Sequence, residues 1–369
     1  METMNYELIN WTRGPPAKLL DKGVEKPQND ISPPSISALT NSKRLQYSNY
    51  MMNTTQSVST MSCSKCGNDC QRFGKHRNGL RRFRCSQCKK TYTEDHTRML
   101  GGYLPEVKVT LALQLLLEGN SIRSTERITN LDRNTIMSLL VRAGERCAAV
   151  MDEKMRNLSC ARLEFDEIWG FVGKKERNVK EGDGYEVGNV WTFCAIDADT
   201  KLVPSFVIGQ RDRNTTNAFV QDVASRMANK VQVSTDGFAP YPDAIRRAFG
   251  KDVDYGQIIK VYGAYSFGER RYSTSGVLAA PKYVQEGRPD YNRISTSYVE
   301  RLNASTRLFM RRMTRLTLAF SKKYENFGAA MALHFAYYNF SRVHRSLKMT
   351  PAMAAGITDH IWTIAELIA

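Results

Sequence analysis

Five of the eight cysteines lie close together in one short, basic stretch of the sequence. Four of them form two CxxC pairs separated by residues 67–84, namely Cys63, Cys66, Cys85 and Cys88. This spacing is typical of a four-cysteine zinc site, because each pair aims two thiolates at one tetrahedral ion. Four thiolates leave no open coordination position, so we expect one structural Zn²⁺. The fifth cysteine, Cys70, breaks the paired pattern and is left out of the expected ligand set.

Three acidic residues occupy positions from which they could act together. Asp166 lies on the predicted strand Leu163-Glu-Phe-Asp-Glu-Ile-Trp169, Asp236 ends a strand in Ser234-Thr-Asp-Gly237, and Glu300 opens the helix Tyr298-Val-Glu-Arg-Leu-Asn303. Carboxylate oxygens are the ligands that Mg²⁺ prefers. Divalent ions held between such groups activate a nucleophile and stabilise the leaving oxygen in phosphoryl transfer. We therefore expect Asp166, Asp236 and Glu300 to be catalytic and to hold two Mg²⁺ (or Mn²⁺) ions.

Other acidic residues compete for this assignment. Glu164 shares a strand face with Asp166 because side chains alternate along a strand, and Asp197 and Asp212 are weaker alternatives. A lone acid at a strand end is ordinarily a solvated cap, so only the combination of three favours a metal site. Gly237, directly after the second acid, lets a substrate or another backbone come close.

The charge of the chain indicates its partner. Lysine and arginine number 53 against 37 acidic residues, which gives a formal net charge of +16 over 369 residues. Such an excess is the electrostatic signature of a polyanion binder, and double-stranded DNA is the expected partner. Arg81, Arg82 and Arg84 lie between the two CxxC pairs. We expect these arginines to contact DNA phosphates; the alternative is a solvated basic face.

Residues 105–150 have a helical period. Val109, Ala112, Leu113 and Leu116 mark a first helix, with Pro105 as its expected first residue. Ser121 and Asp132 can cap a second and a third helix, which together predict a helix-turn-helix. The third helix would enter the major groove by its first residues, which are Arg133, Asn134 and Thr135. The alternative is a plain three-helix bundle that links two domains.

The remaining elements follow the order βββαβαβ and predict an RNase H-like mixed α/β domain. Strands are expected at 162–172, 189–196, 202–208, 231–235 and about 258–262, and helices at about 215–229, 241–249, 296–312 and 324–342. A long loop runs to about residue 295 between the last strand and the helix of Glu300. Arg307 lies two turns beyond Glu300 on the same helix face, and Arg311 continues the basic run. We expect both arginines to contact DNA.

Residues 1–60 are rich in Ser, Thr, Asn, Pro and Gln, which predicts a disordered basic and polar tail. A hydrophobic content of 42% is ordinary for a globular protein and excludes a wholly disordered chain. No run approaches the roughly 18 apolar residues that span a bilayer, and no secretory signal pattern opens the sequence. We therefore expect a cytoplasmic protein that associates with DNA and not with membranes.

Taken together, these residues resemble a known family. Over about residues 61–356 the chain is similar to insertion-sequence transposases of the IS1 type, within the DDE transposase and retroviral integrase superfamily. The motifs that carry this resemblance are Asp166-Glu-Ile-Trp-Gly-Phe-Val-Gly173, Ser234-Thr-Asp-Gly237 and Tyr298-Val-Glu-Arg-Leu-Asn303. A closing segment around His344 is also similar, but we do not assign that histidine to catalysis. The first 60 residues have no counterpart in the family pattern.

The resemblance implies a multidomain α/β protein. Its expected parts are the tail (1–60), a zinc ribbon (61–97), a helix-turn-helix domain (103–150), an RNase H-like catalytic domain (160–345) and a C-terminal segment (346–369). Asp166, Asp236 and Glu300 would form the catalytic triad, and Arg307 would be the basic residue that often follows the glutamate.

The implied function is transposition of an insertion sequence. The protein would bind the terminal inverted repeats, cleave a strand to leave a 3′-OH, and join that end to target DNA. Pairing of two ends implies a homo-oligomer, at least a dimer. Two alternatives stay open: a DNA-binding regulator derived from a transposase, and an RNase H-like nuclease.

Overall fold

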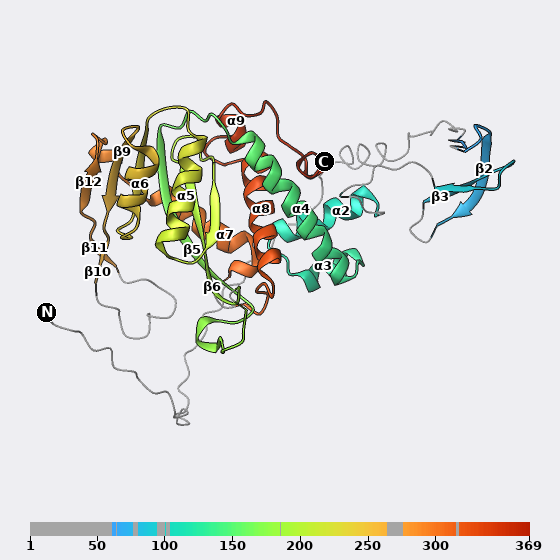
Figure 1. The fold of residues 1–369 in the computed structure, drawn as a ribbon, viewed down its shortest axis with the longest axis horizontal. Coiled ribbons are helices and arrows are strands. Elements are labelled where there is room, and N and C mark those ends of the chain that lie inside the picture. The colour runs from blue at the N-terminus through green and yellow to red at the C-terminus, as the bar shows by residue number, and fades with distance from the viewer. Residues whose placement is uncertain are drawn as a thin grey trace, which may run out of the picture. The chain divides into compact units, whose positions relative to one another are not determined.

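A computed structural model of the chain describes residues 61–63, 65–76, 80–93, 100, 104–184, 186–263, 276–314 and 317–369 (Figure 1). The predicted tail lies outside the described residues. Among the described residues, no helix is both long and apolar enough to cross a bilayer.

The cysteine stretch forms a small antiparallel sheet. Its strands are β1 (Met61–Ser62), β2 (Asp69–Lys75), β3 (Arg81–Cys85) and β4 (Thr91–Thr93), in the order β1-β2-β3-β4. Few of its side chains are buried, chiefly those of Cys63, Phe83 and Cys85. A unit of this size cannot bury enough apolar surface to fold alone, so it needs a cross-link such as a bound metal ion.

The predicted helices after residue 104 are present. They are α2 (Glu106–Leu117), α3 (Ile122–Thr129) and α4 (Arg133–Lys154). The side chain of Ser121 accepts a hydrogen bond from the Ser124 N–H, and Asp132 accepts one from the Asn134 N–H at 2.8 Å, so both expected caps are confirmed. Pro105 is the N-cap of α2, not its first helical residue as we expected. Its ψ of 139° is extended, which places it just outside the helix.

A six-stranded sheet forms the centre of the larger α/β unit. Its strands are β5 (Arg162–Val172), β6 (Gly188–Asp197), β7 (Phe206–Gly209), β8 (Val231–Thr235), β9 (Val253–Ile258) and β12 (Lys282–Glu286). The order across the sheet is β12-β9-β8-β5-β6-β7. β5, β6 and β7 pair antiparallel, β5, β8 and β9 pair parallel, and β12 pairs antiparallel to β9.

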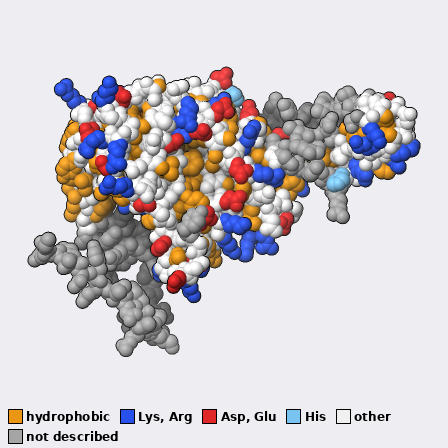
Figure 2. All heavy atoms as spheres, viewed as in Figure 1, with side chains coloured by type: hydrophobic (Ala, Val, Ile, Leu, Met, Phe, Trp, Pro, Cys, Tyr) orange, Lys and Arg blue, Asp and Glu red, His pale blue; other side chains and the backbone are white. Residues whose placement is uncertain are grey.

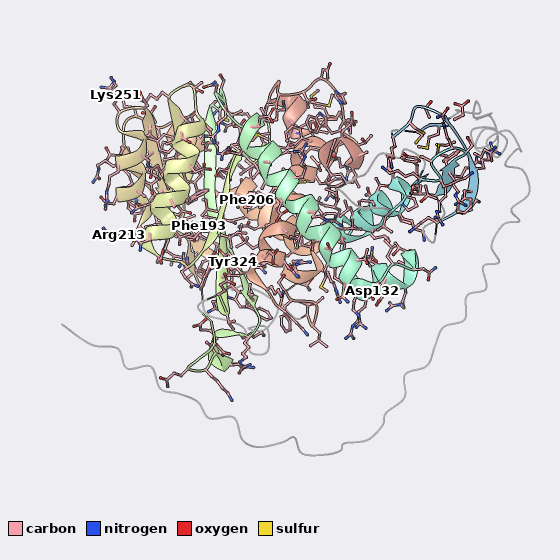
Figure 3. The ribbon with its side chains drawn as sticks, turned by 45° about the vertical axis from the view of Figure 1, so that its right-hand side comes forward. Asp132, Phe193, Phe206, Arg213, Lys251 and Tyr324 are labelled. Atoms are coloured by element: carbon pink, nitrogen blue, oxygen red, sulfur yellow. The ribbon has the colours of Figure 1, made fainter. Side chains whose placement is uncertain are left out.

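Helices cover both faces of this sheet (Figures 1 and 3). The helices of one face are α5 (Arg213–Arg226) and α6 (Tyr241–Phe249), and those of the other are α7 (Ser297–Phe309) and α8 (Tyr324–Phe340). The ring of Phe193 on β6 packs against Phe219 of α5. The ring of Phe206 on β7 packs against Phe335 of α8, with ring centroids 4.9 Å apart. The sheet is therefore buried on both sides.

Two strands begin elsewhere than the sequence predicts. β7 starts at Phe206, because the side-chain amide of Asn339 on α8 bonds both the N–H and the C=O of Val203 in place of a strand partner. β9 starts at Val253, in a segment where Asp254 and Gly256 mask the alternation of buried residues. The strand predicted at about 258–262 covers the end of β9 and β10 (Val261–Tyr262), whereas the predicted loop after it contains β11 (Val277–Ala279) and β12, which were not predicted.

The helical unit and the α/β unit share one apolar core. Buried residues of α2 and α4 are continuous with those of the sheet and of α8. α4 crosses α8 at Gly144, where an added Cβ would overlap the backbone of Ala329. The last short helices, α9 (Pro351–Ala354) and α10 (Ile364–Leu367), also contribute buried residues to this core. The predicted boundary near residue 150 therefore falls within one packed body.

We predict that Gly144→Ala lowers the free energy of unfolding by about 1–3 kcal/mol, because overpacking outweighs the gain in helix propensity of about 1 kcal/mol. The matched control is Gly328→Ala on α8, where the nearest atom to an added Cβ is 3.8 Å away. That substitution should leave stability unchanged or raise it. Thermal unfolding of the two variants checks the prediction, and equal melting temperatures would contradict the close crossing.

Candidate active site and nucleic-acid interface

The first two predicted acids lie where two parallel strands separate. β5 pairs with β8 from Arg162↔Gln232 to Phe165↔Thr235, and there β8 ends while β5 continues to Val172. Asp166 and Asp236 directly follow the last pair. The carboxyl ends of parallel strands meet at the same edge of a sheet, and this geometry brings the two carboxylates together.

A third carboxylate joins them that the sequence analysis did not select. Asp166, Glu167 and Asp236 each offer an oxygen within 4.8 Å of the other two. Alternation along β5 places Glu167 on the opposite face of the strand from Asp166, so the sequence pattern gave no sign that it would join the site. Since β8 has ended at this point, side chains from both faces of β5 reach the same space. A few converging oxygens suit Mg²⁺ or Mn²⁺, so these residues fit a divalent ion.

Glu300 lies in the first turn of α7 and outside that group of three. Its Oε1 accepts a hydrogen bond from the Thr296 hydroxyl at 2.6 Å and forms an ion pair with Lys260. One turn further along α7, Asn303 Nδ2 donates to Asp166 Oδ2 at 2.8 Å. The helix therefore docks on β5 beside Asp166, and the charge of Glu300 acts on that carboxylate.

The rival acids have structural partners instead. Glu164 accepts hydrogen bonds from the backbone N–H groups of Tyr298 (2.7 Å) and Val299 (3.0 Å), and so caps the start of α7. Asp197 accepts from Thr200 in the turn after β6. Asp212 caps α5 by accepting from the Thr215 N–H at 2.8 Å. Each of the three is explained without a metal.

The carboxylate cluster carries negative charge that the protein only partly neutralises. Burial, together with the charges of Glu167, Asp236 and Glu300, raises the pKa of Asp166 to about 7. Burial also raises the pKa of Glu167, whose carboxylate accepts a hydrogen bond from the buried Tyr241 hydroxyl. A divalent cation would relieve this repulsion.

One arginine reaches into the cluster from the loop between β7 and α5. Arg211 Nε donates to Glu167 Oε2 at 3.0 Å, and its Nη2 lies 3.9 Å from Asp236 Oδ2. The guanidinium also lies over the Phe238 ring, 3.9 Å from its centroid. No signal in the sequence marked this residue, because its position depends on the fold.

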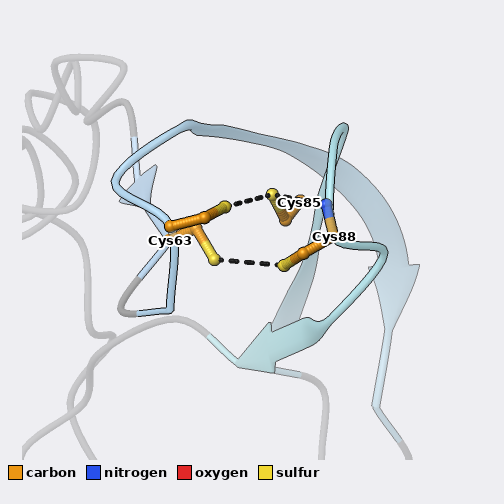
Figure 4. A group of neighbouring side chains, drawn as sticks. Cys63, Cys85 and Cys88 are labelled. Atoms are coloured by element: carbon orange, nitrogen blue, oxygen red, sulfur yellow. Dashed lines mark hydrogen bonds between the residues drawn. The ribbon is translucent and has the colours of Figure 1, made fainter.

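The four predicted zinc ligands also converge (Figure 4). Cys63 Sγ lies 3.5 Å from Cys88 Sγ, and Cys66 Sγ lies 3.4 Å from Cys85 Sγ. Zn–S bonds of about 2.3 Å in a tetrahedron require sulfur separations of about 3.8 Å, so the cluster fits one Zn²⁺. The Tyr92 hydroxyl, 2.9 Å from Cys63 Sγ, lowers the pKa of Cys63 to about 5 and favours the thiolate that binds metal.

The predicted DNA-contacting residues are accessible at two places. At the start of α4, Arg133 and Asn134 are exposed and Thr135 is half-buried. Lysine and arginine side chains gather near α3 in the space-filling view (Figure 2). In the cysteine-bearing sheet, Arg82 and Arg84 lie over the exposed Phe73 ring, with their guanidinium carbons 5.4 and 5.1 Å from its centroid, and Arg81 is exposed.

The basic residues after Glu300 are arranged differently from our expectation. Arg307 donates to the backbone carbonyls of Trp169 (3.1 Å) and Met313 (3.0 Å), which ties α7 to β5. This network gives Arg307 a structural role. Arg311 is exposed and stays a candidate for contact with DNA.

Comparison with known proteins gives the following. No family model matches the chain, and no curated protein matches it in sequence. The chain is similar to a piggyBac transposase synaptic complex with hairpin DNA, with a TM-score of 0.39 and 9% identity over 74% of this chain and 70% of that one. It is also similar to the Mos1 strand transfer complex, with a TM-score of 0.18 and 12% identity over 66% and 80%. TM-scores this low do not establish a shared function.

We predict that Cys63→Ser abolishes zinc binding and unfolds the cysteine-bearing sheet, because three thiolates no longer complete the tetrahedron. Cys70→Ser is the control, since Cys70 lies outside the convergent group. Native mass spectrometry should find about one zinc ion per chain in the wild type and in Cys70→Ser. Full zinc content in Cys63→Ser would refute the ligand set.

We predict that Asp166→Asn stabilises the protein in buffer without Mg²⁺ or Mn²⁺, by about 1–3 kcal/mol at about pH 8. The raised pKa of Asp166 means that wild-type stability falls as pH rises from about 4 to about 7, where the carboxyl loses its proton. The gain should therefore shrink as pH is lowered to about 5. A gain that is absent at pH 8, or that grows in acid, would contradict the charged cluster.

Proposed function

We propose that the chain is a DNA transposase with an RNase H-like catalytic domain of the DDE type. The observation that carries this proposal is the placement of Asp166 and Asp236 at the end of the β5–β8 parallel pair, with Glu300 docked beside them on α7. The strand order β7-β6-β5-β8-β9 supports it, because three antiparallel strands followed by two parallel ones are what an RNase H-like sheet requires.

The proposed reaction is two phosphoryl transfers at one site. In the first, water attacks a phosphodiester, and the bond to the 3′ oxygen breaks to leave a 3′-OH and a 5′-phosphate. In the second, that 3′-OH attacks a target phosphodiester, so one P–O bond forms as another breaks. Two divalent ions held by the carboxylates would activate the attacking oxygen and stabilise the leaving one.

The residues of the chain would have separate tasks in this reaction. Asp166 and Asp236 would hold metal, and Asn303 would orient the Asp166 carboxylate through its 2.8 Å hydrogen bond. Glu300 would complete the site once a metal ion takes the place of Lys260, which now pairs with it. Neither a covalent enzyme intermediate nor a nucleophilic side chain is needed.

The residues that precede the catalytic domain in the sequence would recognise the transposon ends. Arg133 and Asn134, exposed at the start of α4, are suited to hydrogen-bond base edges in a major groove, as terminal inverted repeats require. The arginines of the cysteine-bearing sheet would bind phosphates and contribute to affinity without sequence preference. Pairing of two ends would need at least a dimer.

We predict that Asp166→Ala and Asp236→Ala each lower strand cleavage and joining about 10³-fold or more, while DNA binding stays within a few-fold of wild type. The assay is cleavage and joining of a labelled transposon end with Mg²⁺ or Mn²⁺, run beside a gel shift. Asp197→Asn is the matched control, since Asp197 binds only its own turn. Loss of activity in Asp197→Asn but not in Asp236→Ala would overturn the assignment.

The same assay decides which glutamate completes the site. We expect Glu300→Gln to be as inactive as the aspartate variants, and Glu167→Gln to retain measurable joining, because Glu167 is already bound by Tyr241 and Arg211. The reverse order of activities would make Glu167 the third catalytic acid. Full activity in both variants would remove the third acid altogether.

A further inference from the structure

The acidic cluster already contains a cation that belongs to the protein. Arg211 contacts Glu167 and approaches Asp236, which are two of the three residues whose oxygens converge. The guanidinium also lies over the Phe238 ring. Arg211 is thus a positive group directly beside the place where a metal ion would bind.

The local backbone fixes this arginine in place. Arg211 directly precedes Asp212, which caps α5, so the start of the helix fixes the position of the Arg211 backbone. On the other side of the cap, Arg213 forms an ion pair with Asp243 on α6, with N and O 3.3 Å apart (Arg213 is labelled in Figure 3). The arginines on either side of Asp212 therefore have different partners: Arg211 in the cluster and Arg213 at the surface.

Arg211 and a metal ion compete for the same oxygens. A divalent ion that uses Asp236 and its neighbours as ligands takes lone pairs to which the guanidinium is now attracted, and two cations so close together repel each other. Arginine binds phosphate as readily as carboxylate, through two parallel hydrogen bonds. A DNA phosphate beside the cluster therefore offers Arg211 an equivalent partner.

We propose that Arg211 is a displaceable counterion that couples metal binding to DNA binding. In the DNA-free protein it neutralises Glu167 and Asp236 and weakens metal binding. When DNA is present its guanidinium binds a backbone phosphate, and Asp236, freed from Arg211, holds the metal together with Asp166. This inference rests on the proposed function, and it makes the coupling reciprocal: DNA strengthens metal binding as much as metal strengthens DNA binding.

The first test needs no activity. MnCl₂ is titrated in a calorimeter into the zinc-loaded full chain without DNA, using the wild type, Arg211→Gln and Arg213→Gln. Arg211→Gln should bind Mn²⁺ about 10-fold more tightly, because a competing charge is gone while a hydrogen bond to Glu167 can persist. Arg213→Gln, the matched control, should bind like the wild type. Equal or weaker affinity in Arg211→Gln overturns the proposal.

The second test measures the coupling. A saturating nonspecific duplex should raise the Mn²⁺ affinity of the wild type and of Arg213→Gln several-fold, and should leave that of Arg211→Gln unchanged. If the duplex raised the Mn²⁺ affinity of Arg211→Gln as much as that of the wild type, the proposed movement of the arginine to a phosphate would be wrong. Mn²⁺ binding that Asp166→Asn abolishes but Arg211→Gln leaves unchanged would remove the Arg211 inference alone. A wild type that binds no Mn²⁺ would remove the proposed active site as well.

Discussion

Repulsion among carboxylates at the end of the β5–β8 pair is the constraint on which the rest of this structure depends. Asp166, Glu167, Asp236 and Glu300 act on one another there, and burial makes their charges costly. Clusters of ionisable groups with shifted pKa values are concentrated at sites that bind a cation or a substrate. Lys260 and Arg211 supply part of the missing charge, and a divalent ion would supply the rest.

The fold meets this constraint by rigid attachment of a helix to a strand. Two alternate residues of β5 hold α7: Glu164 caps its first N–H groups, and Asp166 accepts a hydrogen bond from Asn303. The favourable charge of a carboxylate at a helix N-terminus strengthens the first contact. Arg307 fastens the other end of α7 to the backbone of Trp169. The catalytic acids proposed here therefore lie on elements that cannot move apart without breaking several hydrogen bonds.

The sequence predicts an element or a site well where the residues that determine it are close together in the chain. β5, β8 and α6 have the predicted bounds, because strand-forming residues fill the two strands, buried residues of α6 recur at helical spacing, and a polar or glycine turn follows each element. The cysteine cluster was equally predictable from the sequence, since CxxC spacing determines thiolate geometry locally. In contrast, β12 is an edge strand whose exposed Tyr283 and Val284 give no alternation of burial.

The functional residues that were missed have non-local causes. Glu167 joins the site only because β8 ends opposite Phe165, and Arg211 does so only because α5 starts beside Asp236. Arg307 has the predicted helical position, but its side chain turns toward carbonyls that the sequence could not place near it. Spacing identified which residues could do chemistry, whereas pairing and packing decided which of them meet.

Anomalous diffraction at the manganese edge, from crystals of the zinc-loaded protein soaked in MnCl₂, would show whether the carboxylates at the end of the β5–β8 pair bind a divalent ion. We expect a manganese peak about 2.2 Å from carboxylate oxygens of both Asp166 and Asp236, with Arg211 moved away from it. Manganese found only at other surface acids, with the Asp166 and Asp236 carboxylates still bound to protein groups alone, would contradict it.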